Sequence, residues 1–190
     1  LKNNPKGPIH INLSRDVLLS EEFQDFDLCY LCESDMSSLD AAQELILKAK
    51  KPLFVLGAGA ISQAENIKML AEMYQIPVAT TYNGRGIIPE DNPINLGLVG
   101  IRATPRAKYA IDESDCVIAL GSIASERTFP VLDEDKFIHV NINKDVLKGK
   151  YQIQGNVEEV IMTLEFNKVD WIDELLKIDN SMIIEGIGDD

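Results

Sequence analysis

The chain has 190 residues, with 18 Lys or Arg against 31 Asp or Glu, and its formal net charge is −13 at pH 7. This excess of acid excludes the basic face that a nucleic-acid-binding protein needs in order to neutralise phosphates. No stretch is apolar for long enough to be a membrane helix. The cysteine count, three, is odd, which argues against a disulfide framework and favours a reducing, cytoplasmic compartment.

The first part of the chain, residues 1–38, differs in pattern from the rest. It begins without Met or a signal-like pattern, which predicts a segment of a longer protein. Residues 8–13 alternate between apolar and polar like a strand, and the acidic stretch that follows has no sustained period. We therefore interpret residues 1–38 as a strand and a linker that belong to a preceding domain. Cys29 and Cys32 form a C-x-x-C, but no second pair or nearby His completes a zinc site, so partly buried thiols are the favoured interpretation.

Short apolar runs alternate with helical patterns from Leu39 onward. The predicted strands are residues 53–56, 77–81, 116–121, 137–142 and 151–154. The predicted helices are residues 39–49 with Ser37 or Ser38 as cap, a helix opened by the turn Gly57-Ala58-Gly59, residues 105–111 and residues 157–178, while residues 83–100 are predicted as a long loop.

This order predicts an α/β fold in which successive strands are joined by helical crossovers. The expected architecture is a doubly wound, Rossmann-like, mainly parallel sheet of about five to six strands with helices on both faces. We assign residues 39–166 to one central, nucleotide-binding-like domain. Residues 167–190 are predicted to be a helical tail or linker to a further domain.

Two glycine turns mark the candidate ligand site, because open parallel sheets bind ligands beyond the carboxyl ends of their strands. The turn that begins at Gly57 follows one predicted strand and presents amides to an anion, although tight turns need glycine for steric reasons as well. Gly121 and Ser122 repeat the arrangement after another strand, and we expect Gly57 and Gly121 to lie at neighbouring strand tips. Arg102 and Arg127 are the loop cations best placed to meet phosphates, unless they are ordinary surface arginines.

An NAD-dependent dehydrogenase is a poor fit. A dinucleotide fingerprint needs a third small residue and an acid at the end of the second strand, whose carboxylate binds the ribose hydroxyls. Ser62 occupies the third position here, but Thr80 and Thr81 end that strand and supply no carboxylate.

No catalytic or metal-binding residue is predicted. His10 and His139 lie within strand-like runs and are interpreted as structural histidines, while Cys116 lies in an apolar run and is expected in the core. The chain has no H-E-x-x-H, G-x-S-x-G or Walker sequence. Its residues alone therefore predict a nucleotide-type domain with no chemistry of its own.

A series of segments in the same order resembles the thiamine-diphosphate enzyme family that includes acetolactate synthase, pyruvate oxidase and benzoylformate decarboxylase. The opening residues 7–17 are similar to the end of that family's pyrimidine-binding domain. The segments that resemble its central domain are residues 51–60, 76–86, 96–100, 107–110, 115–121, 137–143 and 155–157. Among the enzymes of this family, these segments most resemble the large, catalytic subunit of acetolactate synthase.

The resemblance implies a larger enzyme with flanking domains that hold thiamine diphosphate and Mg²⁺. It implies a carboligase or decarboxylase of 2-keto acids, a transferase of branched-chain amino acid biosynthesis, that assembles as a homo-oligomer. This central part is expected to be catalytically incomplete alone, to dock a cofactor and to bind neither nucleic acid nor membrane. Gly188-Asp189-Asp190 is similar to the family's metal motif but is treated as tail.

In some members of the family the central domain binds FAD, and in others it binds ADP or nothing. The resemblance places cofactor contacts at Gly57, Ala58, Gly59, Thr81, Gly100, Arg102, Gly121, Ser122, Arg127, Asn141, Ile142 and Asn156. The sequence also departs from the acetolactate synthase pattern, with Ile123 in place of an arginine, Ser125 in place of an aspartate, and Asn141, Asn143 and Asn156 in place of acids. Asparagine still forms hydrogen bonds with ribose or adenine but loses the charge-assisted acceptor.

Two other interpretations stay open beside the central domain of a thiamine-diphosphate enzyme. One is a stand-alone nucleotide-binding or regulatory module without catalytic activity. The other is an NAD(P) oxidoreductase, which the missing carboxylate after Thr80 and Thr81 disfavours.

Overall fold

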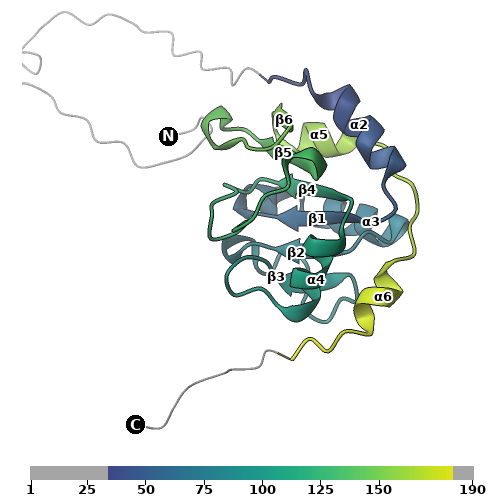
Figure 1. The fold of residues 1–190 in the computed structure, drawn as a ribbon. Coiled ribbons are helices and arrows are strands. Elements are labelled where there is room, and N and C mark those ends of the chain that lie inside the picture. The colour runs from purple at the N-terminus through teal and green to yellow at the C-terminus, as the bar shows by residue number, and fades with distance from the viewer. Residues whose placement is uncertain (1–33, 182–190) are drawn as a thin grey trace, which may run out of the picture.

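The computed structural model describes residues 34–181, and Figure 1 shows their arrangement. The predicted strand at residues 8–13, the C-x-x-C, His10 and the Gly188-Asp189-Asp190 tail lie outside the described residues.

Six parallel strands form one sheet in the order β3-β2-β1-β4-β5-β6. The strands are β1 Pro52–Leu56, β2 Val78–Thr80, β3 Asn95–Leu98, β4 Cys116–Leu120, β5 Phe137–Asn141 and β6 Tyr151–Gln154. The chain adds strands outward from β1 to β3 and then returns to place β4 on the other side of β1. This reversal beside β1 is the switch point of a doubly wound sheet, so the predicted fold class is confirmed.

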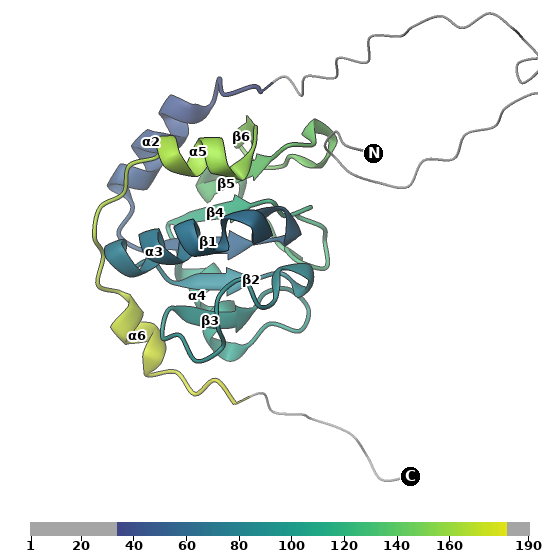
Figure 2. The same cartoon turned by 180° about the vertical axis from the view of Figure 1, so that it is seen from behind.

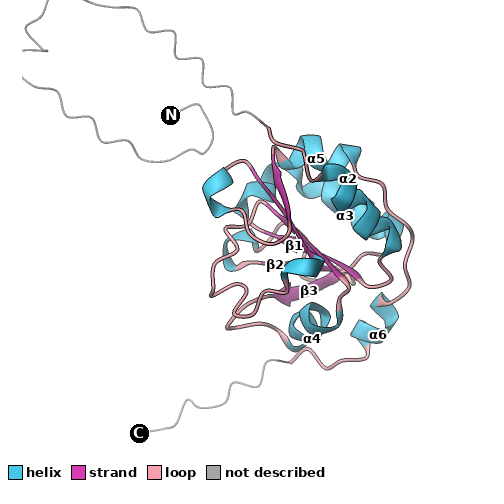
Figure 3. Cartoon of the chain, turned by 45° about the horizontal axis from the view of Figure 1, so that its top comes forward, coloured by secondary structure: helices cyan, strands magenta, loops and turns pink. Residues whose placement is uncertain are grey.

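Helices cover both faces of this sheet, as Figure 3 shows. Helices α2 Leu39–Lys48, α3 Ala64–Tyr74 and α5 Val157–Thr163 lie on one face, and α4 Pro105–Glu113 and α6 Ile172–Leu176 lie on the other. Alternate residues of a buried strand supply the two core layers. Phe54 and Leu56 of β1 pack in the first layer, while Leu53 and Val55 pack in the second.

Strand β3 lies in the stretch that the sequence predicted as a loop. It pairs with β2, and the register of the pairing shifts by one residue between Val78 and Ala79. Val78 N donates a hydrogen bond to Ile94 O at 2.8 Å. The strand has no run of apolar residues and includes Gly97 at φ +94°. The residue pattern of 95–98 does not predict a strand. We therefore attribute the extended conformation of β3 to its pairing with the free edge of β2.

The single helix predicted at residues 157–178 is also wrong. Helix α5 ends at Thr163, residues 164–170 contain no helix, and α6 then forms on the opposite face of the sheet. Figure 1 and Figure 2 show this crossing segment as the trace that runs from α5 to α6 past the ends of α2 and α3. Gln43 of α2 holds it there, because its side chain accepts from Glu165 N at 2.9 Å and donates to Glu165 O at 2.8 Å.

Helix α6 is joined to the rest of the domain by polar contacts as well as by its apolar side. The indole N–H of Trp171 donates to Pro52 O at 3.1 Å, and Tyr109 Oη donates to Glu174 Oε1 at 2.8 Å. Arg106 Nε donates to Ile178 O at 2.8 Å. The segment after α5 contributes to both core layers, with Leu164, Phe166 and Ile172 in the first and Trp171 and Leu175 in the second. Among the described helices, none has the length and apolar content needed to cross a bilayer.

Candidate functional site

A cavity of about 550 Å³ opens at the carboxyl ends of β3, β2, β1 and β4, and we call it the central cavity. This is where ligands bind in open parallel sheets. The loops after all four strands contribute to its walls, and they include the two glycine turns that mark the predicted site. The lining residues are Gly57, Ala58, Thr81, Tyr82, Asn83, Leu98, Val99, Ile101, Arg102, Gly121, Ser122, Ile123, Ser125, Arg127 and Thr128.

The turns after β1 and β4 touch each other at the floor of the central cavity. Gly57 N donates to Leu120 O at 2.9 Å and Gly59 N donates to Gly121 O at 3.0 Å, so the predicted neighbouring tips are confirmed. A Cβ on Gly57 would lie 2.4 Å from Gly121 O. Glycine is therefore required at Gly57 by the packing of one turn against the other, whether or not a ligand approaches.

The turn after β1 differs from the prediction in one respect. It opens a 3₁₀ helix, η1 Ala58–Gln63, and α3 begins only at Ala64. The amides near Gly57 therefore belong to a short, tighter helix, which weakens the expected dipole of a long α-helix at the site.

The structure separates the predicted contact residues into two groups. Those in the lining of the central cavity are Gly57, Ala58, Thr81, Arg102, Gly121, Ser122 and Arg127. Those outside the lining are Gly59, Gly100, Asn141, Ile142 and Asn156.

Three residues of the second group have evident structural roles. Asn156 Oδ1 accepts from Glu158 N at 3.2 Å and caps α5. Asn141 is buried, and its side chain is turned toward the protein, as described below. Gly100 packs against the Arg127 carbonyl, behind the wall of the cavity.

The charge of the central cavity is opposite to that of the chain. Its lining contains Arg102 and Arg127 and no Asp or Glu, whereas the whole chain carries −13. Neither guanidinium forms an ion pair or hydrogen bond with the residues 34–181. Two exposed, unpaired arginines beside glycine turns favour an anionic ligand such as a phosphate ester.

The loop after β4 is held from below by β5. Ser122 O accepts hydrogen bonds from His139 Nε2 at 2.9 Å and from Asn141 Nδ2 at 2.7 Å. Ser122 Oγ accepts from Ala124 N at 3.0 Å, and Ala124 has the left-handed φ of +50°, which is unusual for a residue other than glycine. Burial lowers the pKa of His139, so the ring is neutral near pH 7 and structural, as predicted.

Three large apolar side chains form the rim of the central cavity. Tyr82, Ile101 and Ile123 are 73%, 71% and 64% exposed, respectively. The sequence analysis missed Tyr82 and Ile101 as site residues, because they lie just before and just after the predicted loop at residues 83–100, outside the glycine turns that were considered. The available signal was a large apolar residue in a loop two or three residues after a strand end.

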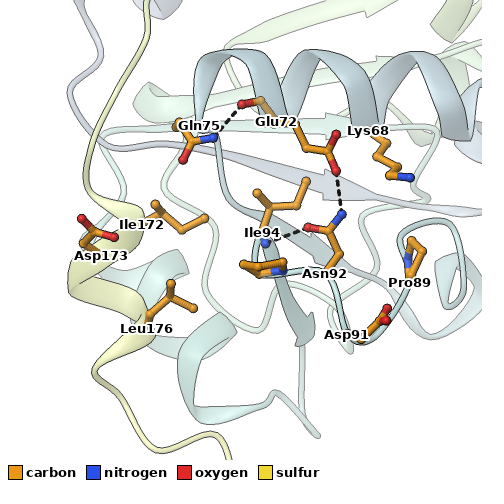
Figure 4. Close-up of a pocket in the computed structure, with 11 residues that line it drawn as sticks. Lys68, Glu72, Gln75, Pro89, Asp91, Asn92, Ile94, Ile172, Asp173 and Leu176 are labelled. Atoms are coloured by element: carbon orange, nitrogen blue, oxygen red, sulfur yellow. Dashed lines mark hydrogen bonds between the residues drawn. The ribbon is translucent and has the colours of Figure 1, made fainter.

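Two more hollows lie on the surface. The side cavity, about 480 Å³, shares Ile123, Ser125 and Arg127 with the central cavity and adds Glu126, Asp145, Val146 and Lys148. The outer hollow, about 540 Å³ and shown in Figure 4, lies between the end of α3, the loop before β3, and α6. It is at the amino ends of the strands, and Glu72 Oε1 is already paired with Asn92 Nδ2 at 2.8 Å. Within the described residues no group of three or more His, Cys, Asp or Glu is placed to hold a metal ion.

Comparison with known proteins agrees with this geometry. Residues 39–164 match the family described as thiamine pyrophosphate enzyme, central domain. The chain is 35% identical over 183 residues to the acetolactate synthase large subunit of Porphyra purpurea, covering 86% of this chain and 31% of that protein. It is 33% identical over 179 residues to the probable acetolactate synthase large subunit of Methanocaldococcus jannaschii, covering 83% and 30%.

A bacterial relative gives the same result. The acetolactate synthase isozyme 1 large subunit of Escherichia coli K12 is 32% identical over 174 residues, covering 83% of this chain and 30% of that protein. The chain thus spans about three-tenths of the length of these curated relatives. The family match shows that this chain belongs to the thiamine pyrophosphate enzymes and that its residues 39–164 correspond to their central domain.

Proposed function

We propose that this chain is the cofactor-docking and structural domain of a thiamine-diphosphate-dependent carboligase or decarboxylase of 2-keto acids, similar to acetolactate synthase. We further propose that its central cavity binds the ADP part of FAD, or ADP itself. Thiamine diphosphate with Mg²⁺ would supply the carbanion chemistry from flanking domains. The proposal includes assembly of the whole enzyme as a homo-oligomer in the cytoplasm.

The observation that carries this proposal is the pair of arginines beside the joined glycine turns, whose guanidinium groups have no ion pair or hydrogen bond within residues 34–181. A diphosphate is the group that best matches Arg102 and Arg127, because guanidinium groups form charge-assisted, bidentate hydrogen bonds with phosphate oxygens. The absence of acid from the lining removes a repulsive charge that would oppose such a ligand. The chain's own part in the reaction is to bind and orient the nucleotide.

The apolar rim favours FAD over ADP. Tyr82, Ile101 and Ile123 surround a polar floor and are mostly exposed. A ligand that carries a flat aromatic system beyond its phosphates would bury part of this apolar surface, and ADP alone would leave it in water.

Titration of the purified chain with FAD and, separately, with ADP tests the proposal. Flavin fluorescence and calorimetry would measure the two affinities, and we expect saturable binding with FAD the tighter ligand. The double variant Arg102→Ala/Arg127→Ala should bind each ligand at least tenfold more weakly, since one charge-assisted hydrogen bond of about 1.5 kcal/mol corresponds to roughly a factor of ten.

Arg85→Ala is the matched control. Arg85 is an exposed arginine outside the cavity lining, and its guanidinium is already paired with Glu90 at 3.2 Å. This variant should bind both ligands like the parent chain. A chain that stays colourless with FAD and shows no thermal shift with either ligand would refute nucleotide binding, as would equal affinities in the double variant and the parent.

A further inference from the structure

Two buried polar side chains of β5 support the Ser122 loop, defined here as residues 121–125. His139 is fully buried and Asn141 is 8% exposed, and their spacing of two places both on the same face of the strand. Both donate to one atom, the carbonyl oxygen of Ser122. That oxygen has two lone pairs, so the two side chains satisfy it completely.

The protonation state of His139 follows from its partners. Lys148 N–H donates to Nδ1 at 2.9 Å, and a backbone amide can only donate, so Nδ1 carries no proton. Nε2 then carries the hydrogen and donates it to Ser122 O, which can only accept. The structure thus specifies a neutral ring in the Nε2–H tautomer.

The same argument fixes the orientation of the Asn141 amide. Asn143 N–H donates to Oδ1 of Asn141 at 3.0 Å, so the other end, Nδ2, faces Ser122 O. A carboxylate at this position would keep the contact with Asn143 but place an acceptor against the Ser122 carbonyl. The asparagine therefore has a specific role here that an aspartate does not reproduce.

We propose that His139, as the neutral Nε2–H tautomer, acts with Asn141 as a positioning residue for the Ser122 loop, and that protonation of His139 disrupts this loop and the neighbouring loop at Lys148. Ser122 lines the central cavity and Lys148 lines the side cavity, so one ring joins the walls of two adjoining hollows. The disrupted loops should in turn bind a ligand more weakly at low pH, a consequence that rests on the nucleotide function proposed above.

The physical basis is a conflict between donors. A protonated ring has N–H on both nitrogens, so Nδ1–H would point at Lys148 N–H and the contact would be lost. The side chain of Lys148 is the charge that acts on the ring, and its positive sign also opposes protonation. The strand neighbours of His139 are Ala119 and Gln152, both uncharged, and the Phe137 ring lies edge-on at 5.6 Å.

NMR spectroscopy of the ligand-free chain tests the positioning role without any nucleotide. Long-range ¹⁵N spectra of the imidazole at pH 7.5 should identify the Nε2–H tautomer. On titration to pH 5, the amides of Ser122, Ala124 and Lys148 should shift with the same midpoint as the ring. An Nδ1–H tautomer, or a ring that titrates without moving these amides, would overturn the proposal.

Variants extend the test to ligand binding. His139→Phe keeps a ring of similar shape without nitrogen, and we expect it to move the Ser122 and Lys148 amides, to weaken ADP binding at least fivefold and to remove its pH dependence. His139→Gln should restore part of the binding. Ile138→Val, a core change in the same strand, should alter neither the loop amides nor ADP affinity. Unchanged loop amides in His139→Phe would contradict the proposal.

If His139→Phe does not fold, a second variant, Asn141→Asp, tests the same proposal. Asn141→Asp should shift the Ser122 amide and weaken ADP binding while leaving the Asn143 contact intact, and parent-like spectra would count against the proposal. If ADP and FAD bind neither the parent nor the variants, the proposed nucleotide function fails, but the NMR measurements still decide the positioning role of His139.

Discussion

Replacing Gly57 by alanine tests how closely the turns after β1 and β4 are joined. The new Cβ would lie 2.4 Å from Gly121 O and 2.5 Å from Ser122 Cα, whereas ordinary contact begins at 3.4 Å, so the strand tips must separate by about 1.0 Å (3.4 − 2.4). These neighbours are backbone atoms that cannot rotate away. The separation would also stretch the hydrogen bonds at 2.9 and 3.0 Å between the two turns.

We expect Gly57→Ala to lower the free energy of unfolding by about 3 kcal/mol. Overpacking contributes roughly 1–3 kcal/mol and each weakened hydrogen bond up to about 1 kcal/mol. For a domain of this size, the corresponding fall in melting temperature is roughly 6–12 °C. Urea and thermal unfolding measure this loss, with the fluorescence of the buried, unique Trp171 as the probe.

Gly155→Ala is the matched control, because it makes the same chemical change after another strand, β6. Its Cβ would lie 3.3 Å from Val160 Cγ2 and 3.5 Å from Met36 Cε, which are side-chain atoms that can move. We expect less than about 1 kcal/mol of destabilisation there. Equal unfolding midpoints for Gly57→Ala and Gly155→Ala would refute the close-contact argument.

Lys136 Nζ donates to three backbone carbonyls at the end of α4, at 2.9–3.3 Å, so Lys136→Met should lower the free energy of unfolding in urea by about 1–2 kcal/mol. The control Lys150→Met breaks an exposed ion pair and should lower it clearly less; a larger loss in Lys150→Met than in Lys136→Met would contradict the prediction. Burial raises the pKa of Cys116 to about 12, so peptide mapping should find this thiol protected from iodoacetamide at pH 8 until urea unfolds the chain, and rapid labelling of the native chain would refute its burial. Burial lowers the pKa of His139, so the unfolded chain binds the proton more readily; the stability it contributes is present above pH about 6.5 and is lost as pH falls toward the folded-state pKa. The thermal midpoint should therefore fall between pH 7 and pH 5, and His139→Phe should lack that part of the decline.

The order of the fold was predictable because most strands are continuous apolar runs buried on both faces. Residues 116–120 are a clear example, with every side chain in the core. Strand β3 was not predictable in this way, since Asn95 and Gly97 interrupt its pattern and its pairing depends on β2. The tail was misread because Val160, Ile161 and Leu164 match a helical period, although α5 ends at Thr163. The residues that follow are extended, and the Phe166 ring packs there against the Phe54 ring at 5.5 Å.

The location of the candidate site was predictable, but the direction of its side chains was not. The doubly wound strand order places β4 beside β1 and so brings Gly57 next to Gly121. The sequence cannot reveal that Asn141 turns toward Ser122 O instead of toward the cavity, because both orientations satisfy the same alternation of the strand. That choice depends on the conformation of the loop above it.

The two outer strands of the sheet also bear on how this domain behaves at high concentration. On one side, Asp35 exchanges backbone hydrogen bonds of 2.8 and 2.9 Å with Gln154 and shortens the open border of β6. On the other, Thr104 N donates to Leu98 O and the Asn95 side chain accepts from Gly97 N, so backbone groups of β3 already have partners. Within the described residues, these bonds take up some of the backbone amides and carbonyls with which a strand of a second molecule would pair, and this opposes growth of the sheet into an aggregate.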